Sequence, residues 1–446
     1  MKRHKLNNRI AGKIILKSEV EKSNDGLWRN RNYVFLFAAQ IISLLGSGVT
    51  TVALAIFAYQ LSGGQSATAI IGNALFLRIL AFLLFSQFAG VLADRVSRKK
   101  ILIVTDILRF GLLALFPFIT EIWHIYALIF AINAVTAFFT PTFEASLPEV
   151  VGETDYVKAL SYSRVAVDIE AFAAPALAGL LVAAFSVRWV FWFDAFTYLV
   201  SAGLVLLVTI PQIKKQLAPM ELRGFIGDLT LGTRILLREP SLRQALILSF
   251  AEATAGAAAI VGTIVYVSDV LQSGDTSFAV VMAVLGLGSS IAAIILGRAT
   301  TRLEADANGK TALHFMRHDW SRTALFVGGI ILGLILLPGF FQPPLVIFAA
   351  LWFLNGAGQA LISIASGTLL AEHTIKEERG RAYAAYFALT HACWLITYPA
   401  IGYAAVWLKT PLTFTLAGAV CLLVVLLAFA LGGQKQSAHK HFAEKS

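Results

Sequence analysis

The chain has 446 residues, of which 58% are hydrophobic and 14% are charged, and its mean hydropathy is +0.75. Soluble domains carry charge on about a quarter of their residues, so this composition excludes a soluble globular protein. The formal net charge of +10 does not indicate nucleic-acid binding, because the basic residues are spread over separate short segments. Cys393 and Cys421 both lie in apolar runs and offer neither a disulfide framework nor a CxxC metal site.

Apolar runs long enough to cross a hydrocarbon core of about 30 Å as helices recur along the whole chain. A membrane β-barrel would show short alternating segments instead. The sequence therefore predicts an all-α membrane protein with twelve transmembrane helices in two six-helix halves. The expected spans are 33–61, 67–89, 101–120, 123–143, 163–185, 189–210, 244–268, 277–297, 323–342, 345–371, 382–406 and 411–432.

The distribution of Lys and Arg predicts the orientation. The first thirty residues are basic and polar and lack the apolar core of a cleavable signal. With twelve spans, 32 of the 36 Lys and Arg residues fall in segments on the same side as the N-terminus. The positive-inside rule then places both termini in the cytoplasm, in a multi-pass protein of the cell inner (plasma) membrane.

The longest polar interruption divides the spans six and six. Within it Phe225, Leu229, Gly232 and Leu236 recur at helical spacing among charged residues, which is typical of an amphipathic helix on the inner membrane face. The predicted parts are a cytoplasmic tail (1–32), a six-helix bundle (33–210), a linker with the amphipathic helix (211–243), a second bundle (244–432) and a second tail (433–446). Echoes between the halves indicate an internal repeat, the architecture of a rocking transporter with its substrate site between the halves.

Uncharged polar residues line up at i, i+3, i+7 spacing in the four spans that hold equivalent places in the repeat, the first, fourth, seventh and tenth. Hydrogen bonding between helices would explain any one of these faces. Their agreement favours a shared polar cavity instead. The expected cavity residues are Gln40, Asn133, Thr136, Glu252, Asn355 and Gln359.

Ionisable residues within the bilayer are costly, so each is a functional hypothesis. Glu252 lies among small residues well inside the seventh span and could exchange a proton as access alternates; the alternative is a structural glutamate bonded to a neighbouring helix. Asp168 and Glu170 are further candidates, although Arg164 lies one turn from Asp168 and could form a structural gate with it. His391 could join the proton path or be a buried, hydrogen-bonded histidine.

Two other sites of charge have simpler explanations. Asp106 and Arg109, at i and i+3 in the third span, are expected to form an internal, structural pair. Asp194 is close enough to the outer end of its span to be hydrated.

The stretch 90–100 packs four cations and one acid into a short turn between two apolar runs. Its order of Gly90, Asp94, Arg95 and Arg98 resembles motif A of the major facilitator superfamily, with Ser97 in the place of the usual glycine. In that family this loop latches the inner gate, so the resemblance implies gating roles for these residues. Glu144, at the inner end of the fourth span, is the expected partner of the arginines.

Further stretches extend the resemblance over the chain between the termini. Residues 174–179 are similar to the antiporter motif of helix 5, with Pro175 and Gly179 in place and an alanine for the first glycine. The helix 4 arginine of drug antiporters has no counterpart, which shifts expected proton coupling to Glu252 and the acids of the fifth span. Residues 141–150, 174–182 and 191–202 resemble the branch that contains macrolide efflux pumps and the enterobactin exporter.

This resemblance implies a secondary transporter, namely a proton-coupled exporter of amphipathic organic compounds such as drugs. The sequence holds no phosphate-binding Gly-x4-Gly-Lys-Ser/Thr motif and no catalytic constellation, so we expect neither an enzyme nor a cofactor. Its expected partners are the lipid bilayer, a small-molecule substrate and protons, with no nucleic acid, and we expect a monomer.

Two alternatives stay open. Some members of the branch resemble nickel-resistance exporters, and His314, His318, Asp319, His439 and His441 could bind a metal transiently, although no resident metal site is expected. A metal or siderophore exporter is therefore the first competitor. A non-transporting membrane receptor is the second, and the aligned polar faces argue against it.

Overall fold

The computed structural model describes residues 26–64, 66–210, 222–306, 310–374 and 376–432. The first bundle consists of long apolar helices that run back and forth and pack on one another. These are α2 (Arg31–Ser62), α3 (Ala67–Arg95), α4 (Arg98–Leu113), α5 (Ile122–Val151), α6 (Glu153–Ala184) and α7 (Val187–Leu207). A short 3-10 turn, Phe116–Phe118, follows α4 where Pro117 stops the helix.

The second bundle begins with a span made of α9 (Pro240–Ala257), two π-helical turns at Ala258–Gly262 and Tyr266–Val270, and α10 (Thr263–Val265) between them. Its other helices are α11 (Asp275–Asp306), α12 (Lys310–Leu336), α13 (Leu345–His373), α14 (Lys376–Leu408) and α15 (Thr410–Gly432). Within the described ranges, ten segments are long and apolar enough to cross a membrane. The more polar α6 and α14, with 32 and 33 residues, complete two groups of six.

The helices α5 and α6 are longer than predicted. The expected spans end at 143 and begin at 163, whereas α5 continues through two prolines to Val151 and α6 starts at Glu153. The polar residues of this region suggest a loop, but Leu147 and Ala159 are fully buried in a second small core and keep the helices regular beyond the apolar run. Gly152, with φ of 79°, makes the tight turn between them.

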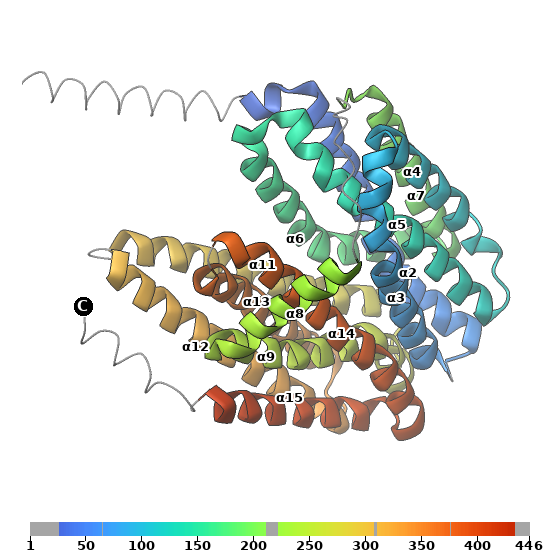
Figure 1. The fold of residues 1–446 in the computed structure, drawn as a ribbon. Coiled ribbons are helices and arrows are strands. Elements are labelled where there is room, and N and C mark those ends of the chain that lie inside the picture. The colour runs from blue at the N-terminus through green and yellow to red at the C-terminus, as the bar shows by residue number, and fades with distance from the viewer. Residues whose placement is uncertain (1–25, 65, 211–221, 307–309, 375, 433–446) are drawn as a thin grey trace, which may run out of the picture.

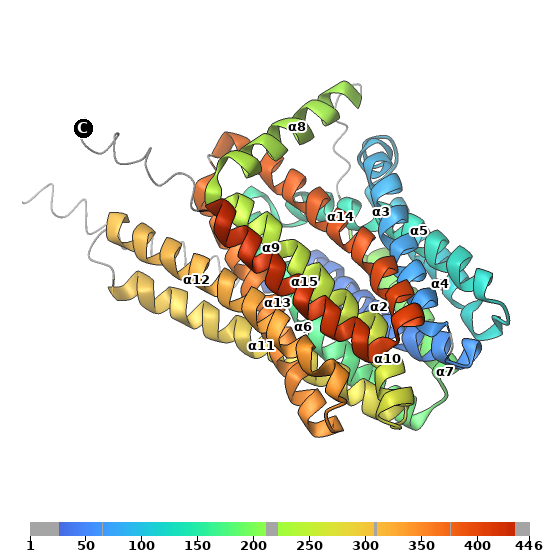
Figure 2. The same cartoon turned by 90° about the horizontal axis from the view of Figure 1, so that it is seen from below.

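The two bundles meet along two helix pairs, α3 with α14 and α6 with α11. We call the side on which α2 begins and α15 ends the termini side, and the opposite side the far side. Figures 1 and 2 show that α2 and α15 lie far apart on the termini side and approach each other on the far side. The bundles therefore diverge toward the termini side.

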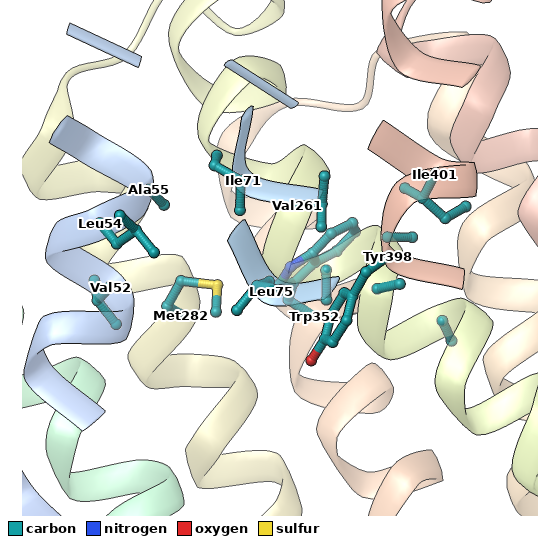
Figure 3. Close-up of a cluster of buried hydrophobic side chains, with 14 of the residues drawn as sticks. Val52, Leu54, Ala55, Ile71, Leu75, Val261, Met282, Trp352, Tyr398 and Ile401 are labelled. Atoms are coloured by element: carbon teal, nitrogen blue, oxygen red, sulfur yellow. The ribbon is translucent and has the colours of Figure 1, made fainter. Parts of the chain in front are cut away.

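A core of apolar side chains joins the halves below this divergence. Figure 3 shows Val52 and Leu75 of the first bundle facing Met282, Trp352 and Tyr398 of the second. These side chains are at least nine-tenths buried, so the two halves are packed closely here.

The linker contains the expected helix, α8 (Leu222–Arg238). Leu236 is fully buried, and a Cβ at Gly232 would lie 2.3 Å from the carbonyl oxygen of Arg381 in α14. The described part of this helix therefore packs against α14, because glycine lets the two backbones approach closely, and its place on the inner membrane face stays a prediction.

Candidate functional site

Two adjacent cavities lie between the bundles. The first, of about 340 Å³, is lined by the first bundle except for Phe387 and His391 of α14, and we call it the N-half cavity. The second, of about 430 Å³, is lined by both bundles and lies closer to the far side; we call it the shared cavity. Arg78, Ile79 and His391 line both. The cavities are thus adjacent, with these three side chains between them.

The predicted polar faces of the first bundle line the N-half cavity. Gln40, Ser43 and Ser47 come from α2, and Asn133 and Thr136 come from α5. Asn133 Nδ2 and Thr136 Oγ1 also donate to carbonyls of their own helix, each at 2.8 Å. Each of these two polar groups thus has a hydrogen-bond partner within its own helix.

The corresponding faces of the second bundle differ from the prediction. Gln359 lines the shared cavity, but Glu252 and Asn355 are not among the described residues that line either cavity. Asn355 is fully buried and its Oδ1 accepts a hydrogen bond from Gln359 Nε2 at 2.7 Å, so it holds Gln359 in place.

Glu252 is placed elsewhere because α14 packs on its face of α9. Ser249, one turn earlier, hydrogen-bonds the Tyr386 hydroxyl at 2.8 Å, and a Cβ at Gly256, one turn later, would lie 2.1 Å from the ring of Trp394. The polar face of α9 therefore makes helix–helix contacts, the alternative that periodicity could not exclude. The carboxyl group of Glu252 lies close enough to Tyr386 for electrostatic interaction.

Two of the other proton-coupling candidates line a cavity, and the third has an undescribed side chain. Glu170 lines the shared cavity, where a Cβ at Gly48 would lie 2.2 Å from its Oε1, so its carboxylate is tucked against α2. His391 Nδ1 donates to the carbonyl of Phe387 at 2.8 Å, and the ring lines both cavities. The side chain of Asp168 lies outside the described residues, as does that of Arg164.

Asp106 and Arg109 form the expected internal ion pair. The guanidinium of Arg109 also stacks between the rings of Phe139, at 4.2 Å, and Tyr198, at 4.4 Å. Asp106 Oδ2 accepts from Ser201 Oγ at 2.7 Å. Arg109 is 2% exposed yet contributes to the wall of the N-half cavity, so a buried charge network supports that wall, although Nε of Arg109 has no hydrogen-bond partner among the described residues.

The expectation that Asp194 is hydrated is wrong, because its side chain is only 1% exposed. Its carboxylate accepts hydrogen bonds from Thr50 Oγ1 and Thr197 Oγ1, and Gly46 of α2 leaves room for it. The signal for this contact was present in the sequence: Thr50 shares the polar face of Gln40, and Thr197 follows Asp194 by three residues.

Contacts are described for only part of the predicted gating stretch, residues 90–100. Arg98 Nη1 forms an ion pair with Glu149 Oε1 at 2.6 Å and a hydrogen bond to the Ala145 carbonyl. Glu149 meets Arg98 because α5 extends far enough to bring it beside the start of α4, while a pairing of Glu144 with Arg95 stays a prediction. Glu144 lines the N-half cavity. Gly90 has no side chain, and those of Asp94 and Arg95 lie outside the described residues.

The helix 5 motif lies at a contact between the halves. Pro175 is inside α6 and lines the shared cavity, and a Cβ at Gly179 would lie 2.9 Å from Cβ of Ala279 in α11. The motif therefore shapes the α6–α11 contact. His314, His318, His439 and His441 lie outside the described side chains, and the described residues hold no cluster of three potential metal ligands.

Hydrogen bonds that the sequence did not reveal close the far side. Thr68 Oγ1 donates to the Gly402 carbonyl at 3.0 Å, and Gln60 Nε2 donates to Asp275 Oδ2 at 2.9 Å. Two more join Tyr59 to Asp269 and Asn73 to Tyr403. With the apolar core of Figure 3, these contacts form a far-side seam between the halves.

The sequence is similar to those of known membrane transporters. The sequence matches the family model of the Major Facilitator Superfamily over residues 36–316 and 315–446. It is 26% identical over 436 residues to YfiS, an uncharacterized MFS-type transporter of Bacillus subtilis (strain 168), covering 93% of this chain and 96% of that protein. Macrolide efflux protein A of Streptococcus pyogenes is 26% identical over 228 residues, or 50% of this chain and 55% of that protein.

A solved structure has a similar fold. The crystal structure of the nucleoside transporter NupG superposes with a TM-score of 0.69 and 13% identity, covering 90% of this chain and 99% of that one. At this identity the likeness shows the fold alone.

Proposed function

The chain belongs to the Major Facilitator Superfamily of membrane transporters, and on that premise we propose that it is a proton-coupled exporter of amphipathic organic compounds. The observation that carries the proposal is the pair of adjacent cavities between the bundles, which combine polar groups with aromatic rings. A site of mixed polarity suits a substrate with a polar group and an apolar body.

Two observations support outward transport. The positive-inside rule places the termini side in the cytoplasm, so the diverging bundles would accept substrate from inside the cell. A relative over half of the chain is a macrolide efflux protein. In this arrangement the far-side seam is the barrier that must open for release, while the termini side closes.

In this proposal, acidic residues near the cavities bind and release the coupled proton. Glu170 lines the shared cavity, and Glu252 lies within a few residues of Gly256, which packs against the cavity residue Trp394. Asp168 and His391 are further candidates. A carboxyl group in the bilayer interior that alternates between two sides can couple a proton to the change of access.

The test is proton-gradient-dependent uptake of two xanthene dyes, cationic rhodamine 6G and anionic fluorescein, into everted membrane vesicles. We expect gradient-dependent uptake of at least one dye by the wild type and its loss in Glu252→Gln. The exposed Glu121→Gln, outside both cavities, is the matched control and should transport normally.

Two other results are informative. Normal transport by Glu252→Gln would assign Glu252 a structural role, and Glu170→Gln would then be expected to lose coupling. If the wild type, present in the membrane in folded form, moves neither dye under any gradient, the proposal is overturned.

A further inference from the structure

Arg78 is an exposed arginine in the middle of a transmembrane helix. It lies eleven residues after Ala67, or roughly 16 Å along the helix axis, and its side chain lines both cavities. Its Nη1 donates to Thr51 Oγ1 at 3.2 Å. A guanidinium carries five N–H donors, so this one neutral partner leaves most of its capacity for other groups. At this depth such a charge is costly and marks a functional site.

The opposite half presents a second polar group to the same space. His391 of α14 lines both cavities, and Arg78 is close enough to act on it electrostatically. Because the carbonyl of Phe387 can only accept, the proton of neutral His391 is on Nδ1, which leaves Nε2 for a ligand. Nε2 can accept from an acid or, once protonated, donate to an anion.

Aromatic rings surround this pair. One turn closer to the termini side, Phe82 and Phe387 approach across the two halves with ring centroids 6.3 Å apart. Toward the far side, Trp394 and Tyr398 line the shared cavity. A ligand held at Arg78 would therefore place its apolar body against aromatic surfaces on either side.

The acid in the shared cavity is suited to compete with such a ligand. Glu170 lies close enough to Arg78 for their charges to interact, yet its carboxylate is tucked against the backbone of α2 at Gly48. Glu170 can therefore offset the charge of Arg78 only in part. A ligand with its own anionic group would take over that role.

We propose that the exported compounds are organic anions, with a carboxylate or similar group beside an aromatic or apolar body, and that Arg78 binds the anionic group with His391 as the contact from the other half. This inference rests on the proposed function and names its substrate class. Guanidinium and carboxylate match in a two-pronged geometry, which gives a strong, directional contact. An anion between Arg78 and His391 also links the halves and neutralises Arg78 before the cavity closes.

The test compares fluorescein with rhodamine 6G, which share a ring system and differ in charge. In everted vesicles we expect the wild type to take up fluorescein, and Arg78→Gln to raise its KM about 10- to 100-fold, as loss of a charge-assisted contact implies. Arg78→Lys should recover only part of the affinity, because it keeps the charge and loses the two-pronged geometry. Arg298→Gln, an exposed arginine outside both cavities, is the control and should behave as wild type.

Binding of fluorescein to the purified, detergent-solubilised protein, followed by fluorescence polarisation, separates recognition from transport. Size-exclusion chromatography of each variant identifies any that fail to fold. If the wild type moves rhodamine 6G but neither binds nor moves fluorescein, or if folded Arg78→Gln handles fluorescein normally, the anion assignment falls and the export proposal stands. If neither dye is moved, both fall.

Discussion

Gly72 of α3 is the position where a single methyl group should change the balance between conformations. A Cβ there would lie 2.5 Å from the carbonyl oxygen of Tyr398, and real Cβ atoms essentially never approach a neighbour closer than 3.0 Å. In Gly72→Ala the two helices must therefore separate by at least about 0.5 Å. The obstacle is backbone, so no side-chain rotation relieves it.

The substitution should raise the free energy of the conformation in which the far-side seam is closed. The α3–α14 contact belongs to the far-side seam, where Thr68 donates to the Gly402 carbonyl at 3.0 Å, and alternating access requires the seam to open. Overpacking of this kind costs about 1–3 kcal/mol. Because the open state avoids the clash, the substitution should shift the equilibrium toward the far-side-open state by roughly 5- to 150-fold.

Cross-linking of two introduced cysteines by a short bifunctional thiol reagent measures this shift. Cysteines at Gln60 and Asp275, whose side chains are hydrogen-bonded at 2.9 Å, report the closed seam in a background where Cys393 and Cys421 are alanine. We expect Gly72→Ala to cross-link more slowly and less completely. Gly111→Ala is the matched control, because a Cβ there meets nothing within 4 Å. Equal cross-linking by Gly72→Ala and Gly111→Ala would refute the reasoning.

Three smaller changes test other contacts. Thr50→Val removes a hydroxyl donor from the buried Asp194 and should lower stability by about 1–3 kcal/mol, seen as a lower Tm in detergent; an unchanged Tm would contradict the contact. Glu149→Ala leaves Arg98 without its carboxylate and should cost about 1.5–3 kcal/mol in the same measurement, with Glu121→Ala as the unaffected control. Gly256→Ala pushes on an indole of the shared-cavity wall and should change the KM for the transported dye while the protein remains folded; an unchanged KM would count against that contact.

The spans were predictable because the bilayer requires continuous apolar runs, and only their ends were misplaced. Where α5 and α6 leave the apolar region, burial of Leu147 and Ala159 continues the helices, and local composition does not report such tertiary contacts. Periodicity correctly grouped the polar residues of each face. It placed Gln40 at the cavity wall, but it could not decide whether a face meets a cavity or another helix.

This ambiguity explains why the predicted cavity face of the second bundle differs from the structure. The face of Glu252 has the same spacing as that of Gln40, yet α14 covers it. Arg78 shows the opposite case, because a single arginine has no pattern and its place at the junction of both cavities follows from the meeting of two halves. Contacts between residues hundreds of positions apart, such as Thr68 with Gly402, leave no local trace in one sequence.

The N-half cavity is lined almost entirely by the first bundle, and this matters for how the transporter could acquire new substrates. Apart from Phe387 and His391, its wall belongs to the first bundle, whereas closing the far side requires both bundles. Substitutions on α2 or α5 can therefore remodel recognition while leaving the moving contacts of the second bundle untouched. Selection for a new compound should accumulate changes in the first two hundred residues, and a library confined to those two helices would be the efficient starting point for directed evolution.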